Sequence, residues 1–197
     1  MGILIDRNSR IVIQGITGRE ASMVTRHMLA YGTPVVAGVT PGKKGEQVHG
    51  VPVYDTLKQA CRAHELNTAL IYVPPAFALD AVLETLANGI KLMVIITENI
   101  PLHDTVKLLM EADNAGARVI GPNTTGIINP KERARLGAIG GDNVERCFVP
   151  GSEKVTTARV SGSFSKRASR SLGVEPIRES PPMPIAVLTP NPARLTM

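Results

Sequence analysis

Three small residues, Gly15, Gly18 and Ala21, are spaced three apart after a short apolar run, and this spacing is suited to binding a phosphate. The run Ile11-Val12-Ile13 is β-branched, as expected of a buried parallel strand. Residues with helical spacing follow the glycines: Met23, Val24, His27, Met28 and Ala30. The first N–H groups of a helix have no acceptor within the helix, so they can bind a phosphate. Because the spacing departs from Gly-x-Gly-x-x-Gly, a plain strand–helix joint is an equal alternative.

The second predicted strand, Val35–Val39, ends in a basic turn. A site for NAD usually carries an acidic residue here, which binds the ribose hydroxyls. This sequence instead reads Thr40-Pro41-Gly42-Lys43-Lys44-Gly45. Cations at this place suit a ligand with an extra phosphate near the ribose, which means coenzyme A or NADP rather than NAD.

Strands and helices alternate along residues 11–126, with short connections. Beyond the first unit, the apolar runs predict strands at 35–39, 69–73, 91–96 and 118–120, and a short extended piece at 51–54. Helices are predicted from Asp55 or Thr56 to His64, over 77–88, and over 102–115 with Val106, Leu109, Met110 and Asp113 along one side. This order predicts an α/β, Rossmann-like, doubly wound and mostly parallel sheet. Ligands of such sheets bind beyond the carboxyl ends of the strands, here the loops 15–21, 40–45, 73–76, 97–101 and 121–126.

These loops contain Gly, Pro, Thr, Asn, Lys and one Glu, but no nucleophile paired with a base, so we predict no catalytic residue in them. The four histidines lack metal-ligand spacing, and His49 is interpreted as a surface residue. Cys61 and Cys147 lie far apart and are interpreted as reduced, structural thiols. We therefore predict no metal site.

The composition divides the chain into residues 1–150 and 151–197. Residues 152–197 hold seven basic and three acidic residues and six of the fifteen prolines, whereas residues 1–151 are nearly neutral. We interpret 151–197 as a poorly ordered tail. A basic excess confined to a tail without aromatic residues interleaved argues against nucleic-acid binding. No apolar run approaches the ~20 residues that span a bilayer, and no signal peptide is seen, so we expect no membrane association and a cytoplasmic location.

Seven short segments together resemble the coenzyme A-binding domain of the succinate–CoA ligase (succinyl-CoA synthetase) α subunit. They are Ile3–Asp6, Gln14–Gly18, Tyr31–Thr33, Gly38–Lys43, Tyr72–Pro74, Ile96–Pro101 and Gly121–Asn123, and they follow the family's order and spacing over about residues 3–150. The chain departs from the family at Ala21, Lys44 and Asn99, where the family usually has Gly. After Gly151 we recognise no counterpart of the family's second domain, which carries a phosphorylated histidine.

The resemblance implies a set of coenzyme A-binding residues. Thr17, Gly18, Arg19 and Glu20 would lie against the phosphates, and Lys43 would pair with a phosphate. Ile96, Thr97 and Glu98 would contact the pantetheine or adenine side. The same set includes Val39, Pro41, Tyr72, Pro74 and Asn123.

Three hypotheses about function follow. In the first, the chain is a truncated α subunit of an NTP-dependent succinate or other acid–CoA ligase, and works with a β subunit that binds the nucleotide. In the second, it is a non-catalytic coenzyme A-binding module that has lost the phosphohistidine domain. The third, a fragment of an NADP-binding oxidoreductase, rests on the basic turn alone. The sequence does not identify the acid, the NTP or the oligomeric state.

Overall fold

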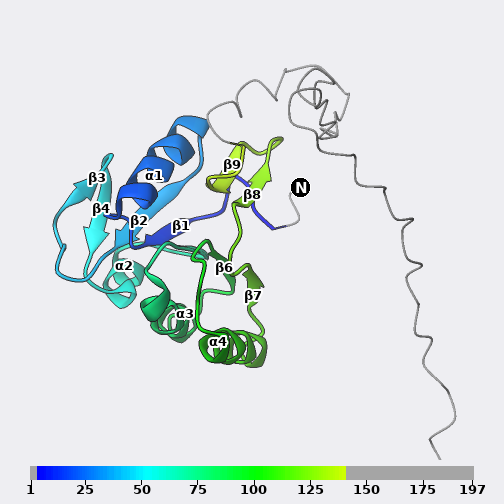
Figure 1. Cartoon of the computed structure of the whole chain (residues 1–197). Helices are drawn as coiled ribbons and strands as arrows, with labels where there is room; N and C mark the ends of the chain where they lie inside the picture. The colour runs from blue at the N-terminus through cyan, green and yellow to red at the C-terminus, as the bar shows by residue number, and fades with distance from the viewer. Residues whose placement is uncertain (1–3, 141–197) are drawn as a thin grey trace, which may run out of the picture. The chain divides into compact units, whose positions relative to one another are not determined.

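A computed structural model describes residues 4–140, which contain a mostly parallel sheet between two layers (Figure 1). Seven strands pair in the order β3-β4-β2-β1-β5-β6-β7, and all neighbours run parallel except β3 and β4. The strands are β1 (Ile11–Gln14), β2 (Val35–Val39), β3 (Gln47–Val48), β4 (Val51–Tyr54), β5 (Thr68–Ile71), β6 (Leu92–Ile95) and β7 (Arg118–Ile120). The predicted fold class, a Rossmann-like and mostly parallel α/β sheet, is confirmed.

Four α-helices connect these strands and cover the sheet. They are α1 (Arg19–Tyr31), α2 (Leu57–Ala63), α3 (Ala78–Ala87), which follows the 3₁₀ turn η1 (Pro75–Phe77), and α4 (Leu102–Asn114). The bounds agree with the predicted helices within a few residues. The two candidate caps of the second helix are resolved in favour of Thr56, whose hydroxyl oxygen accepts a hydrogen bond from the backbone N–H of Gln59 at 3.3 Å.

Side chains of each central strand alternate between two hydrophobic cores. Val12 of β1 packs with residues of α2, α3 and α4, whereas Ile11 and Ile13 of the same strand pack with Val24 of α1 and with Leu136. A strand that is buried on both faces reads as a continuous apolar run, which is why these strands were visible in the sequence.

A hairpin that the sequence reading did not predict completes the layer that contains α1. It consists of the antiparallel strands β8 (Gly126–Asn129) and β9 (Ala134–Gly137), and Figure 1 shows it beside α1. The hydroxyl of Thr33 donates to the backbone carbonyl oxygen of Arg135 at 3.0 Å and accepts a hydrogen bond from the backbone N–H of Arg135 at the same distance. Leu136 is fully buried between the hairpin and the sheet. The hairpin therefore belongs to the core of the domain.

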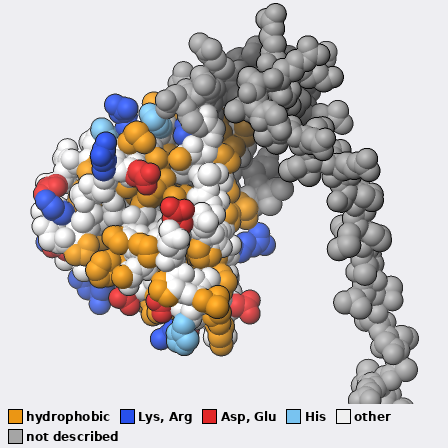
Figure 2. Space-filling model, viewed as in Figure 1, with side chains coloured by type: hydrophobic (Ala, Val, Ile, Leu, Met, Phe, Trp, Pro, Cys, Tyr) orange, Lys and Arg blue, Asp and Glu red, His pale blue; other side chains and the backbone are white. Residues whose placement is uncertain are grey.

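Helix α4 turns its predicted apolar side outward. Val106, Leu109 and Met110 are 49%, 41% and 60% exposed, while Leu108 and Ala112 are buried against the sheet. Figure 2 shows hydrophobic side chains over this helix. Spacing alone did not decide which of the two apolar sides faces the core.

The predicted tail, residues 151–197, lies outside the described residues, so the domain boundary near residue 150 stays a prediction. Within residues 4–140, no helix combines the length and the apolar composition that crossing a bilayer would require.

Candidate functional site

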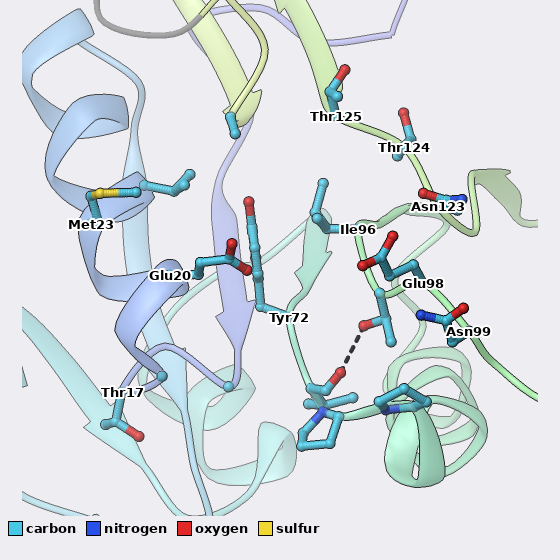
Figure 3. Close-up of a pocket in the computed structure, with 18 of the residues that line it drawn as sticks. Thr17, Glu20, Met23, Tyr72, Ile96, Glu98, Asn99, Asn123, Thr124 and Thr125 are labelled. Atoms are coloured by element: carbon cyan, nitrogen blue, oxygen red, sulfur yellow. Dashed lines mark hydrogen bonds between the residues drawn. The ribbon is translucent and has the colours of Figure 1, made fainter.

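One cavity of about 830 Å³ opens where the strands β1, β5 and β6 end (Figure 3). The start of α1, the loop after β7 and the residue following β9 complete its wall. Its lining residues are Gly15, Thr17, Gly18, Glu20, Met23, Val24, Thr40, Tyr72, Val73, Pro74, Pro75, Ile96, Thr97, Glu98, Asn99, Asn123, Thr124, Thr125 and Ala138. This is the edge of the sheet at which the fold class predicts a ligand.

The turn between β1 and α1 forms one end of the cavity. The N–H of Gly15 donates to the carbonyl oxygen of Val39 at 2.7 Å, and the N–H of Gly18 donates to that of Gly15 at 2.9 Å. The N-cap residue, Gly18, which immediately precedes the helix, supplies no side-chain cap. The first N–H groups of α1 therefore retain their capacity to bind a ligand anion. The hydroxyl of Thr17 donates to that of Thr40 at 3.2 Å, which joins this turn to the end of β2.

Tyr72 stands in the middle of the cavity, between Glu20 and Ile96 (Figure 3). Its backbone N–H donates to the carbonyl oxygen of Gln14 at 3.0 Å, which fixes the residue at the end of β5. Burial, and secondarily the Glu20 carboxylate, raise the pKa of the Tyr72 phenol to about 12, although Arg135 acts in the opposite direction. The phenol is therefore protonated near neutral pH and can donate a hydrogen bond to a ligand.

The end of β6 forms the opposite wall. The hydroxyl of Thr97 donates to the carbonyl oxygen of Val73 at 2.7 Å, the dashed bond in Figure 3, and the carbonyl oxygen of Thr97 accepts from the N–H of Asn123 at 3.1 Å. Asn99 and Asn123 both have φ of 57°, a left-handed conformation that Asn tolerates better than most residues. These bonds hold the loops after β5, β6 and β7 together, with Glu98 pointing into the space between them (Figure 3).

The charged lining residues of the described cavity are two carboxylates, Glu20 and Glu98, and the lining contains no Lys, Arg or His. The rest of the lining consists of hydroxyl, amide and apolar groups together with backbone. Such a wall favours a ligand that presents N–H and O–H donors and apolar surface, and disfavours an anionic group deep inside.

Nine of the thirteen residues predicted for cofactor binding line the cavity: Thr17, Gly18, Glu20, Tyr72, Pro74, Ile96, Thr97, Glu98 and Asn123. Four do not. Val39 is buried at the end of β2 and contributes its carbonyl oxygen to Gly15, while Arg19 and Pro41 are exposed outside the lining. Lys43 is also outside the lining, and its Nζ pairs with Glu46 Oε1 at 2.9 Å.

Most lining residues that were not singled out lie in loops predicted to face a ligand. Thr40, Val73, Pro75, Asn99, Thr124 and Thr125 are of this kind. Met23 and Val24 belong to α1, where helical spacing indicated a core role. Ala138 follows the unpredicted hairpin, so no sequence signal pointed to it. Within residues 4–140, no three His, Cys, Asp or Glu side chains are grouped so that they could hold a metal ion.

Comparison with known proteins adds an independent line of evidence. Residues 6–99 match the family model described as the CoA binding domain. Subunit alpha 2 of ADP-forming succinate–CoA ligase from Archaeoglobus fulgidus is 52% identical over 130 residues, which are 66% of this chain and 45% of that subunit. The SqwL subunit of an ADP-forming sulfoacetate–CoA ligase from an Acholeplasma species is 43% identical over 169 residues, which are 86% of this chain and 56% of that subunit. The chain thus spans about half the length of these curated relatives.

The second of these matches also bears on the C-terminal segment. Because it covers 169 of the 197 residues, it includes residues 141–169, and the similarity therefore extends past Gly151, where we recognised no counterpart. Among solved structures, the chain is similar to ATP citrate lyase from Methanothrix soehngenii, solved in complex with citrate and coenzyme A. The TM-score is 0.64 at 21% identity, over 74% of this chain and 25% of that one, which supports the fold alone.

Proposed function

We propose that this chain, which is related to the succinate–CoA ligase α subunits through its CoA-binding domain, binds coenzyme A in the cavity at the carboxyl ends of β1, β5 and β6. One observation carries the proposal. Loops that are up to about one hundred residues apart in the sequence converge on one cavity, and nine of the thirteen residues that the resemblance assigned to the cofactor lie in its wall.

The charges suggest how the cofactor lies. Coenzyme A carries its negative charge on the nucleotide phosphates, and its pantetheine arm is uncharged with two amide N–H groups. Glu20 and Glu98 would repel phosphates placed deep in the cavity but accept hydrogen bonds from the arm. Glu20 belongs to the first turn of α1, but its side chain points toward Tyr72 (Figure 3). We therefore assign the phosphates to the backbone N–H groups at the start of α1 and to the turn 40–45, and the arm to the space around Tyr72 and Ile96.

The activity we propose for the complete assembly is that of an α subunit in an acid–CoA ligase. The relatives are named as ADP-forming ligase subunits for succinate and for sulfoacetate, so both acids are candidates. In this proposal a β subunit supplies the nucleotide site, the phosphorylated histidine comes from a domain that residues 4–140 do not include, and the assembly is cytoplasmic. The alternative is a coenzyme A-binding module without catalytic activity. Turnover of succinate or sulfoacetate with ATP, after a β subunit is added, distinguishes the two.

Calorimetric titration of the purified chain tests the binding proposal. Coenzyme A should bind and NADPH should bind more weakly; tighter binding of NADPH would favour the oxidoreductase hypothesis. Lys43→Ala should lower the affinity for coenzyme A, because a charge-assisted hydrogen bond to phosphate is about twice as strong as a neutral one. Lys107→Ala, on the exposed side of α4, is the matched control and should leave the affinity unchanged. Absence of coenzyme A binding by the folded chain would refute the proposal.

A further inference from the structure

The basic turn after β2 is fixed beside the cavity by its backbone. The N–H of Lys43 donates to the carbonyl oxygen of Thr40 at 3.2 Å, and Thr40 lines the cavity. On the other side of the turn, the N–H of Lys44 donates to Asp55 Oδ1 at 3.1 Å and that of Gly45 donates to the carbonyl oxygen of Val53 at 3.1 Å. The backbone of Lys43 is therefore anchored three residues along the chain from Thr40, which lines the cavity.

The ammonium group of Lys43 already has a partner. Its Nζ lies 2.9 Å from Glu46 Oε1, and both side chains are about half exposed, at 49% and 50%. Glu46 is also held in place by its backbone, since its N–H donates to the carbonyl oxygen of Lys43 at 3.1 Å and its carbonyl oxygen accepts from the N–H of Val53 at 3.0 Å. The carboxylate of Glu46 is thus held beside Lys43, the lysine that the proposed function assigns to a phosphate.

An ammonium group that is paired with a carboxylate binds a phosphate more weakly than an unpaired ammonium group does. The phosphate must displace the carboxylate, and it then lies near a negative charge that remains on the turn. A half-exposed ion pair is weak, so a phosphate can displace it, but part of the favourable energy is lost. We propose that Glu46 is a selectivity-determining residue, which competes with the ribose phosphate of the ligand for Lys43 and lowers the affinity for coenzyme A. This inference rests on the proposed function, because it requires that coenzyme A binds here.

The test compares two ligands that differ only in the ribose phosphate. Glu46→Gln should bind coenzyme A about two- to fivefold more tightly than the natural chain in calorimetric titration, the range expected of an exposed ion pair. The affinity for 3′-dephospho-coenzyme A should not change. Glu132→Gln is the matched control, since it also removes one negative charge and one ion pair, with Arg7 at 2.7 Å, and neither residue lines the cavity. It should leave both affinities unchanged.

A second variant separates competition for Lys43 from simple repulsion. With Lys43→Ala in place, the additional change Glu46→Gln should raise the affinity for coenzyme A by less than it does when Lys43 is present, because no ammonium remains to be released and only the repulsion by the carboxylate is removed. An equal gain in the presence and absence of Lys43 would refute the competition, as would weaker binding by Glu46→Gln, which would mean that Glu46 positions Lys43 for the phosphate. If the natural chain and the variants all fail to bind coenzyme A, both this inference and the proposed function are refuted. If all bind equally, only this inference is refuted.

Discussion

A methyl group at Gly15 would test whether the turn between β1 and α1 builds the cavity. Gly15 has φ of +81°, and a Cβ atom there would lie 2.8 Å from the carbonyl oxygen of Tyr72. The substitution Gly15→Ala therefore introduces two costs, a strained backbone and a collision with the backbone of the residues that follow β5. The same residue bonds to Val39 and to Gly18, so a displacement of it disturbs both the end of β2 and the start of α1.

Gly89 separates the two costs because it has nearly the same φ, +79°, and open space where its Cβ would be. A left-handed alanine costs about 1–2 kcal/mol, and this applies to both Gly15→Ala and Gly89→Ala. Overpacking against backbone adds about 1–3 kcal/mol at Gly15 alone. Near the midpoint, a domain of this size loses very roughly 4 °C per kcal/mol. We expect Gly89→Ala to lower Tm by about 4–8 °C and Gly15→Ala by about 8–20 °C.

Thermal unfolding followed by circular dichroism measures both shifts, and titration with coenzyme A below the lower Tm measures the effect on the site. Gly89→Ala should retain the affinity of the natural chain, since it lies at the end of α3 and outside the cavity wall. Gly15→Ala should lose affinity even where it is fully folded. Equal Tm shifts would show that the approach to Tyr72 is not tight, and undiminished affinity of folded Gly15→Ala would show that this turn does not shape the cavity.

Two further predictions concern Tyr72. Tyr72→Phe should lower the affinity for coenzyme A about two- to tenfold in calorimetry, the effect expected of losing one neutral hydrogen bond. Tyr54→Phe is the control and should leave this affinity unchanged, because it removes a hydroxyl that is bonded to His64 outside the cavity wall. The pKa of the Tyr72 phenol is raised to about 12 in the folded chain, so the folded state holds this proton more tightly than the unfolded state, and the stability that it contributes is present below about pH 10 and is lost as the pH rises toward 12. Between pH 9 and pH 11.5, the free energy of unfolding measured with urea should therefore fall more for the natural chain than for Tyr72→Phe. Equal decreases in the two proteins would contradict the raised pKa.

The central strands β1 and β5 were predictable because they are buried on both faces. Strand residues such as Val12 and Ile13 point to opposite cores, so the sequence shows an uninterrupted apolar run. The ligand loops followed from the same reasoning, since parallel strands end at one edge of the sheet. The hairpin β8–β9 was not predictable in this way. Its residues include Asn129, Pro130 and Lys131, and its place in the core depends on contacts with α1 and with Thr33, which are about a hundred residues distant in sequence.

Side-chain partners were the part of the site that spacing could not supply. The sequence places Lys43 and Glu46 three residues apart, but only the bend of the turn, closed by the bond from the N–H of Glu46 to the carbonyl oxygen of Lys43, brings their charges to 2.9 Å. Lys43, which was predicted to bind a phosphate, is therefore paired with Glu46 in the structure. Tyr72 illustrates the opposite case, because its motif marked it as a contact while its place between Glu20 and Ile96 required the structure.

The charge of the cavity wall constrains the ligand more strongly than the fold does. A dinucleotide and coenzyme A can both place a phosphate at the start of α1, and the fold alone does not choose between them. Two carboxylates and no cation in the described wall favour an uncharged, donor-rich group for the part of the ligand inside. The pantetheine arm is such a group. Glu20 and Glu98 therefore favour a ligand whose inner part carries no phosphate, as in coenzyme A bound through its nucleotide end.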